Sequence, residues 1–329
     1  MLTILSRIYG AVVARRNAGF NERRRPITSV AVPVVSVGNI SVGGTGKTPV
    51  VQAIVRLLQS QGKRPAIIMR GYRRTSKGLL VVHDGASLRT TVSNAGDEAY
   101  LHAIALGVPV VVSNNKAEAA AYTAANMPCD VLVVDDGFQH RALHRDLDVV
   151  LIDRQSIEGT LLPGGRLREP LAELSRADVI LCMGDVRTRE VKALGVGNSL
   201  VLPCAIEAHR AMSVNIPSIE LNAASKVVAV AGIGNPERFI QTLEKLQYSV
   251  VDKVIFPDHH RYTTKDVERL CEVASKRGAV LVTTEKDAVK LQPLMFVNGA
   301  QRAPMYVVTI HAILHDDAFS ALLVQRTSR

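Results

Sequence analysis

Short apolar runs alternate with amphipathic segments along the chain, and this alternation predicts its secondary structure. The runs between Val34 and Cys182 are four to six residues long and rich in valine and isoleucine. We expect strands at Val34–Val37, Ala66–Met69, Val108–Ser113, Val131–Val134, Val149–Ile152 and Val179–Cys182. Strands with near-continuous apolar runs are buried on both faces, which is typical of a parallel sheet covered by helices.

The amphipathic segments between these runs predict helices, which lie at Pro49–Gln61, Asp97–Leu106 and Lys116–Asn126. A second alternating series begins near Lys226 and continues to Thr284, whereas residues 185–224 are polar and irregular. We therefore expect an α/β protein with a core domain of residues 26–205, built on a mostly parallel sheet flanked by helices. A smaller C-terminal α/β domain of residues 206–329 would follow it.

Residues 1–25 combine an apolar stripe with a strongly basic composition. Leu5, Ile8 and Val12 recur at helical spacing, and the segment holds six arginines and one glutamate, a net charge of +5. Such an amphipathic helix suits the surface of an anionic membrane. It equally suits a helix packed on the protein with its basic face in solvent, and the pattern alone leaves both possibilities open. Arg7 interrupts the apolar stretch, which argues against a secretory signal.

Composition narrows the class of protein. The 329 residues suffice for about two domains, and the net charge is +10. The four cysteines lie at least 22 positions apart, which argues against a zinc ribbon or a disulfide scaffold and favours a reducing compartment. No apolar run approaches the ~20 residues needed to cross a bilayer. Nucleic-acid binding is a further option for the basic arm, but no aromatic residues interleave it.

A glycine-rich turn after the first strand carries the strongest chemical signal. Lys47 and Thr48 follow the turn directly and precede a helix, which is the setting of a phosphate-binding loop. Lys47 would neutralise the β- and γ-phosphates, and Thr48 would hold Mg²⁺. The nucleotide-binding residues would be Ser41, Val42, Gly43, Gly44, Thr45, Gly46, Lys47 and Thr48. Ser41 stands where the general motif has its first glycine.

Two carboxylates follow a later strand. Asp135 and Asp136 end the run Val131–Val134, and ligands bind at the carboxyl ends of strands in an open parallel sheet. One of them would hold Mg²⁺, directly or through water. Asp97, at the start of a predicted helix, is either an N-cap or a group that takes the proton of an attacking hydroxyl.

Other polar residues at strand ends are candidates for substrate binding. They are Arg70, Arg73, Gln139, Arg168 and Glu169. Arginines on such loops suit bidentate capture of a phosphate. The sequence Asp258-His259-His260 is a poor metal chelate, because adjacent side chains point in different directions, so one acid–base or orienting histidine is the better interpretation. Residues 284–287 lack the Asn-Lys-x-Asp spacing with which proteins recognise guanine. ATP is therefore the favoured nucleotide.

Several of these stretches together resemble the tetraacyldisaccharide 4′-kinase family, the lipid A 4′-kinases of Gram-negative bacteria. The matching segments are VGNISVGGTGKTP, RGYRR, GDEA, VLVVDDGFQHRAL, LPGGRLREP, FPDHHRY and TTEKDAVKL. They occur in the family's order between about residues 30 and 292. Ser41 is usual in this family's loop, whereas Ala99 departs from its pattern, which has proline there.

The resemblance implies ATP- and Mg²⁺-dependent phosphorylation of the 4′-hydroxyl of a tetraacylated glucosamine disaccharide 1-phosphate. It implies a P-loop core domain and a smaller α/β domain with the site between them. Asp97 would be the catalytic carboxylate, working with His259, while Lys47, Thr48, Asp135 and Asp136 would keep their phosphate and metal roles. It also implies that residues 1–25 contact the cytoplasmic face of the inner membrane, making the protein a peripheral one.

Two rival functions are weaker on sequence grounds. A membrane-docking switch ATPase that regulates a partner often has an extra lysine early in the loop, where this chain has Val42. A basic nucleic-acid-binding module gives no account of the paired Asp135 and Asp136.

Overall fold

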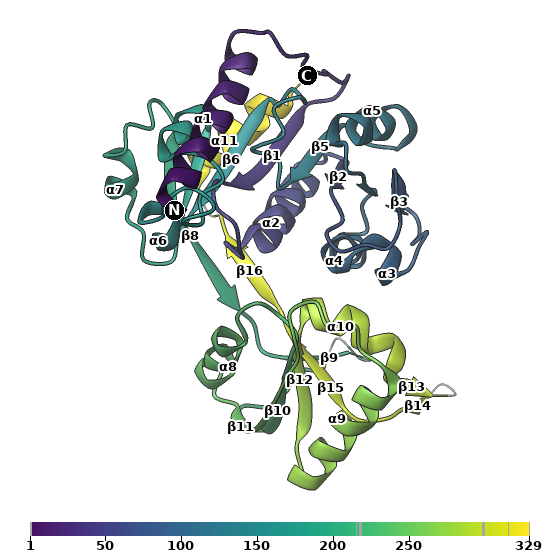
Figure 1. The fold of residues 1–329 in the computed structure, drawn as a ribbon. Coiled ribbons are helices and arrows are strands. Elements are labelled where there is room, and N and C mark those ends of the chain that lie inside the picture. Colours follow the sequence, from purple (N-terminus) through teal and green to yellow (C-terminus); the bar gives the residue numbers. More distant parts are fainter. Residues whose placement is uncertain (1, 215, 217–218, 298–299, 315, 329) are drawn as a thin grey trace.

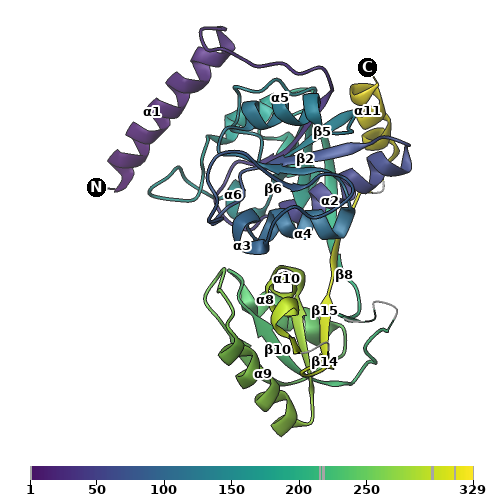
Figure 2. The same ribbon diagram turned by 90° about the vertical axis from the view of Figure 1, so that its right-hand side faces the viewer.

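The computed structural model describes residues 2–214, 216, 219–297, 300–314 and 316–328. It contains a nine-stranded sheet and a five-stranded sheet, which form two parts joined by a pair of strands (Figures 1 and 2). The expected α/β architecture of two unequal parts is therefore confirmed.

The larger sheet has the order β16-β8-β7-β6-β1-β5-β2-β4-β3. Its strands are β1 (Val34–Asn39), β2 (Pro65–Met69), β3 (Leu80–His83), β4 (Val110–Val112), β5 (Val131–Asp135), β6 (Leu147–Ile152), β7 (Val179–Met183), β8 (Leu200–Ala208) and β16 (Ile310–Ile313). All pair in parallel except the two edge strands, β3 and β16. All six strands predicted between Val34 and Cys182 are present, and β1, β5 and β6 are buried along their whole length.

Helices cover both faces of this sheet (Figure 1). Their bounds are α2 (Lys47–Ser60), α3 (Val92–Ala95), α4 (Asp97–Leu106), α5 (Lys116–Asn126), α6 (Arg154–Ile157), α7 (Thr188–Lys192), α11 (Asp317–Thr327) and the 3₁₀ helix η1 (Leu171–Arg176). Side chains of α2, α4 and α11 share one core, whereas α5 contributes to the core on the opposite face. The predicted helices Asp97–Leu106 and Lys116–Asn126 have exactly the observed bounds.

The smaller sheet has the order β11-β10-β12-β15-β9, and only β9 is antiparallel to its neighbour. Its strands are β9 (Met212–Ser213), β10 (Lys226–Ala231), β11 (Ser249–Ile255), β12 (Val280–Thr284) and β15 (Met305–Val308), and a separate hairpin joins β13 (Phe296–Val297) to β14 (Ala300–Gln301). The helices are α8 (Pro236–Lys245), α9 (Thr264–Arg277), α10 (Glu285–Leu291) and the 3₁₀ helix η2 (Gln292–Leu294). Helices α8 and α9 contribute to separate cores.

The boundary predicted at residues 205 and 206 is wrong. It falls inside β8, which starts in the larger sheet and runs on toward the smaller part, where Ala208 pairs with Ile310 of β16 (Figure 1). The chain then returns, and Phe319 and Leu323 of α11 are buried in the core of the larger part. Residues 310–328 therefore belong with the first domain. The sequence hid this because β8 reaches the larger part only partly buried and pairs there with β16, a strand about 100 positions later in the chain.

Helix α1 (Leu2–Asn21) confirms the helix expected near the start of the chain. It lies along the outside of the larger part (Figure 2) and exposes Leu2, Ile4, Ile8 and Val12. Tyr9 anchors it, since its hydroxyl donates a hydrogen bond to the carbonyl oxygen of Arg168 at 2.9 Å. No helix in the described part of the chain is long and apolar enough to span a membrane.

Candidate active site

Residues 41–48 form the predicted strand–loop–helix arrangement between β1 and α2. Gly43 and Gly46 have φ angles of 112° and 88°, which side chains with a Cβ adopt only with strain. A Cβ added at Gly44 would meet no atom within 4 Å, so this side of the loop is open. Arg166 fixes the loop from behind, because its guanidinium donates to the carbonyl oxygen of Val42 at 2.9 Å. The loop thus has the open, glycine-shaped backbone that close approach of a phosphate requires.

Side chains inside the loop hold its shape. The Ser41 hydroxyl lies 2.9 Å from that of Ser156, and Asn39 donates a hydrogen bond to the hydroxyl of Thr45 at 2.9 Å. Ser41 and Thr45 are both buried. Their side chains therefore act within the protein, and only their backbone groups remain for a nucleotide.

Lys47 points to the carboxylate pair at the end of β5. Its Nζ lies 3.3 Å from Oδ1 of Asn39 and 3.5 Å from Oδ1 of Asp136. Strands β1 and β5 are neighbours, so their carboxyl ends place Lys47 and Asp136 in one site. The loop lysine and the acid that sequence reasoning paired with it are thus brought together.

The two aspartates differ in environment. Asp135 is buried, and its Oδ2 lies 3.3 Å from Nε2 of His102. Asp136 is more exposed and forms an ion pair of 2.9 Å with Arg168. Burial opposes ionisation of both carboxyls, but His102 lowers the pKa of Asp135, and Lys47 and Arg168 lower that of Asp136, below the ordinary range. Both groups are therefore carboxylates at neutral pH.

Asp97 contacts a histidine and a lysine of the smaller domain. Its Oδ2 lies 3.1 Å from Nδ1 of His259 and 3.2 Å from Nζ of Lys290. Burial raises the pKa of Asp97, but these two partners outweigh it and hold the pKa below its ordinary value. Asp97 is the first residue of α4, and Gly96 occupies the cap position, so the N-cap interpretation is wrong. The predicted pairing of Asp97 with His259 is present.

The strand order and two contacts place Asp97 at the same sheet edge as residues 41–48. Strand β5 lies between β1 and β2, and the loop after β2 packs so closely on Gly96 that an added Cβ would lie 2.8 Å from the carbonyl oxygen of Tyr72. Within α4, His102 reaches Asp135. Helix α4 therefore contains both Asp97 and the residue that contacts Asp135, one of the two proposed metal-binding carboxylates.

Helix α10 of the smaller domain lies against α4 of the larger part (Figures 1 and 2). Lys286 on α10 forms an ion pair with Glu98 on α4, beside the contact between Lys290 and Asp97. His259 itself has a φ of 60°, an unusual angle for a residue with a side chain. The residues around Asp97 thus come from both domains.

Comparison with known proteins identifies the family of this chain. The family model LpxK, described as tetraacyldisaccharide-1-P 4′-kinase, matches residues 1–328. The chain belongs to this kinase family. Tetraacyldisaccharide 4′-kinase of Syntrophus aciditrophicus is 37% identical over 325 residues, covering 89% of this chain and 84% of that protein. The enzyme of Desulfotalea psychrophila is 39% identical over 288 residues, covering 84% and 81%.

A solved structure shows the same fold. A crystal structure of LpxK from Aquifex aeolicus in complex with ATP matches with a TM-score of 0.79 and 29% identity, over 99% of this chain and 98% of that one. The chain is therefore a tetraacyldisaccharide 4′-kinase, which phosphorylates the 4′-hydroxyl of tetraacyldisaccharide 1-phosphate with ATP in lipid A biosynthesis. The switch ATPase and the nucleic-acid-binding module are excluded as its main function.

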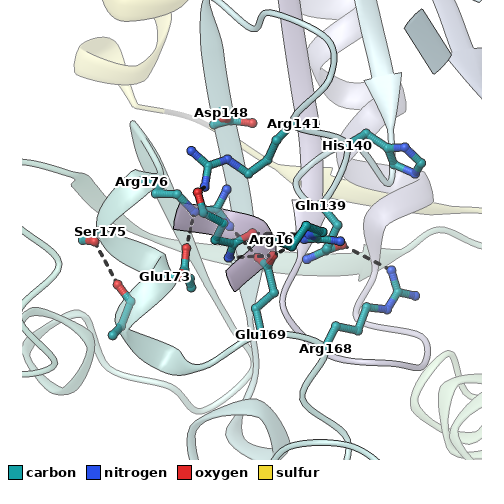
Figure 3. A network of polar contacts seen from close by, with 12 residues as sticks. Arg16, Gln139, His140, Arg141, Asp148, Arg168, Glu169, Glu173, Ser175 and Arg176 are labelled. Atoms are coloured by element: carbon teal, nitrogen blue, oxygen red, sulfur yellow. Dashed lines mark hydrogen bonds and ion pairs between the residues drawn. The ribbon is translucent and has the colours of Figure 1, made fainter. Parts of the chain in front are cut away.

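Among the kinase residues expected to bind substrate, Arg168 and Gln139 lie at the phosphate loop. Arg168 contacts Asp136, and its Nη1 lies 3.4 Å from Oε1 of Gln139. Figure 3 shows Arg168 and Gln139 side by side. Gln139 donates a hydrogen bond to the carbonyl oxygen of Asn39 at 2.8 Å. Burial lowers the pKa of the neighbouring His140 to about 4, so this ring is neutral at physiological pH.

Arg70 and Arg73 differ in their surroundings. Both follow β2, and Arg70 is exposed at its end. Arg73 instead donates a hydrogen bond to the carbonyl oxygen of Asp258 at 2.7 Å. Arg73 thus forms a hydrogen bond between the two domains next to His259. One of its guanidinium nitrogens is therefore already used by the protein.

The surroundings of Glu169 argue against the prediction that it binds substrate. Its side chain is fully buried, and its carboxylate accepts from Arg16 at 2.7 Å, from Asn17 at 3.2 Å and from Arg176 (Figure 3). A buried carboxylate with three partners is not available to a ligand unless these contacts break. Glu169 instead fastens α1 to the loop that carries Arg168.

We expect Glu169→Gln to destabilise the kinase. The substitution leaves Arg176 and Arg16 without their shared counter-charge, and the free energy of unfolding should fall by about 2 kcal/mol or more. Thermal unfolding measures this, with Glu173→Gln as a control, because Glu173 pairs with Arg176 from a more exposed site. An unchanged melting temperature combined with a raised KM for the lipid would restore the substrate-binding role.

Sequence reasoning missed Lys116. This residue is almost fully buried and donates hydrogen bonds to the carbonyl oxygens of Asp135, at 2.7 Å, and of Asp136. Burial lowers its pKa to about 8, despite the two nearby aspartates. Lys116 stabilises the bend after β5, where Asp136 has a φ of 54°. No sequence motif marks it, because its partners are backbone atoms.

Proposed function

We propose that residues 41–48 bind the triphosphate of ATP and that Asp97 activates the acceptor hydroxyl. The amide groups of the loop and the N-terminal end of α2 provide a site for the phosphates. Lys47 adds a positive charge next to Asp136, and Arg168 adds a second. Phosphoryl transfer needs mainly positioning and neutralisation of charge, and both are supplied here.

The residues at this site also fit Mg²⁺. The Thr48 hydroxyl and the carboxylates of Asp135 and Asp136 are hard oxygen ligands, which Mg²⁺ prefers. We propose that Asp136, the more exposed carboxylate, holds the ion and that Asp135, fixed by His102, supports it. The bound ion would neutralise charge on the β- and γ-phosphates.

The observation that carries the mechanism is the contact between Asp97 and His259. Asp97 is ionised, lies at the carboxyl edge of the sheet that also carries the loop, and is oriented by a histidine 3.1 Å away. We propose that Asp97 accepts the proton of the 4′-hydroxyl as its oxygen bonds to the γ-phosphorus. The bond from that phosphorus to the β-phosphate oxygen breaks, and ADP leaves.

The direct test combines the kinase with ATP, Mg²⁺ and tetraacyldisaccharide 1-phosphate and follows transfer of labelled γ-phosphate to the lipid. The expected product carries a new phosphomonoester at the 4′ position, and its amount equals that of the ADP formed. Hydrolysis of ATP without a labelled lipid would contradict the mechanism.

We further propose that α1 binds the cytoplasmic face of the inner membrane, where its lipid substrate resides. Its exposed apolar side chains lie on a helix that also carries Arg7, Arg15 and Arg16. Apolar groups enter the acyl boundary of a membrane while guanidinium groups meet anionic head groups. Arg16 already forms an ion pair with Glu169, so Arg7 and Arg15 would provide most of the electrostatic attraction to anionic head groups.

The double substitution Ile8→Glu and Val12→Glu should weaken membrane binding. Both side chains are more than half exposed, at 57% and 63%, so folding should be little affected. Each substitution removes an apolar side chain that the membrane would bury. Binding to vesicles containing anionic phospholipid should therefore fall at least about tenfold in a flotation assay. Val324→Glu, an exposed apolar position on α11, is the control. If the wild type, the double variant and Val324→Glu bind vesicles equally well, α1 does not attach the protein to the membrane.

A further inference from the structure

Lys290 is a buried cation that the mechanism above does not use. It lies on α10 in the smaller domain, with its side chain only 8% exposed, and its Nζ is 3.2 Å from Oδ2 of Asp97. Burying an ammonium group is costly unless nearby acids compensate it. A lysine in this position is therefore expected to have a role at Asp97.

A rigid support holds Lys290 in place. Its Nζ lies 3.1 Å from Oδ1 of Asp287, one turn earlier on α10. The other oxygen of Asp287 accepts hydrogen bonds of 2.9 Å from the backbone of Gly232 and from the hydroxyl of Thr284. Asp287 is fully buried. The ammonium group is thus set in position before any substrate arrives.

The two partners of Asp97 act on the same oxygen. His259 and Lys290 both contact Oδ2, and among the described residues no hydrogen bond to Oδ1 is found. Two donors on one oxygen restrict rotation of the carboxylate. The second oxygen then keeps a lone pair free for the proton of the acceptor hydroxyl.

The other charged and titratable groups near Asp97 are few. Asp258 lies 3.8 Å from the far nitrogen of His259, and the ring of Tyr262 lies 5.3 Å from Nζ of Lys290. Glu98, the next residue on α4, is neutralised by Lys286. Lys290 is therefore the one lysine among the described residues that contacts the Asp97 carboxylate directly.

We propose that Lys290 is a positioning residue for phosphoryl transfer, which holds Oδ2 of Asp97 so that Oδ1 faces the acceptor hydroxyl. The proposal rests on Asp97 as the proton acceptor. Because Lys290 and His259 both belong to the smaller domain, the carboxylate is oriented only when that domain lies against α4. The complete site is thus a property of the two-domain arrangement.

The experiment compares Lys290→Met, which keeps length and removes charge, with Lys290→Arg, which keeps the charge. Lys290→Met should lower kcat roughly tenfold to a hundredfold, the effect of a slightly misplaced reacting group, and leave the KM for ATP unchanged. The acid limb of the pH profile of kcat should move to higher pH, because removing the ammonium group raises the pKa of Asp97. Because Lys290→Arg keeps the positive charge, the acid limb of its pH profile should lie close to that of the wild-type enzyme.

Lys286→Met is the matched control, since it removes an ion pair from the same helix and the same domain contact without touching Asp97. An acid limb that shifts equally in Lys286→Met and Lys290→Met would overturn the proposal, as would a Lys290→Met enzyme with a wild-type pH profile. Asp97→Asn separates the two failures. If it retains full turnover, Asp97 is not the proton acceptor. If it is inactive while Lys290→Met is normal, only the role of Lys290 falls.

Discussion

Lys47→Ala is expected to reduce phosphoryl transfer by roughly a thousandfold or more, because it removes the positive charge nearest the expected position of the β- and γ-phosphates. The side chain is only 16% exposed, and its Nζ already lies between Asn39 and Asp136. Without it, Asp136 keeps Arg168 as its counter-charge, so the fold should survive while charge on the phosphates is less well neutralised.

The measurement for Lys47→Ala is single-turnover transfer of labelled phosphate to the lipid at saturating ATP. Lys276→Ala is the control, since it deletes an exposed lysine on α9 whose one ion pair among the described residues is with Glu272. Thermal unfolding should be similar for both variants. A Lys47→Ala enzyme with turnover close to the wild type would reject the assignment of residues 41–48 as the phosphate-binding loop.

Asp97→Asn is expected to lower kcat by roughly a hundredfold to ten-thousandfold, the range typical of losing a positioned proton acceptor. The amide has the same shape as the carboxylate but cannot take the proton of the 4′-hydroxyl. The KM for ATP should change little, because the proposed phosphate site lies at the start of α2 and Asp97 belongs to α4.

Steady-state kinetics with both substrates varied test this expectation, with Glu98→Gln as the neighbouring control. Glu98 lies beside Asp97 and pairs with Lys286, so its loss weakens the domain contact and leaves the proton acceptor in place. The drop in kcat should be far larger for Asp97→Asn. Equal values of kcat for the two variants would show that Asp97 acts through the domain contact alone.

Much of the fold follows from local patterns in the sequence. The six strands predicted between Val34 and Cys182 each contain an apolar run, and such runs can be identified without knowing their neighbours. The phosphate loop is equally local, because its glycines, Lys47 and the start of α2 are consecutive in the chain. Family resemblance added the pairing of Asp97 with His259, which lie 162 positions apart and share no local pattern.

Other features depend on contacts between distant residues and could not be predicted from the sequence. Glu169 looks like a polar loop residue until Arg16 and Arg176 enclose it. The end of the chain returns to the first sheet through β16, whose pairing with β8 spans about 100 positions of sequence.

The sequence by itself determined the two α/β parts, the nucleotide loop and the carboxylates at the strand ends, because apolar periodicity and glycine-rich turns act over a few neighbouring residues. Only the tertiary structure decided which groups share one oxygen of Asp97, that Lys116 supports the bend at Asp136, and where the domains divide. These outcomes depend on burial and on charge pairing across separate elements. Both arise only when the chain has folded and water has been excluded between them.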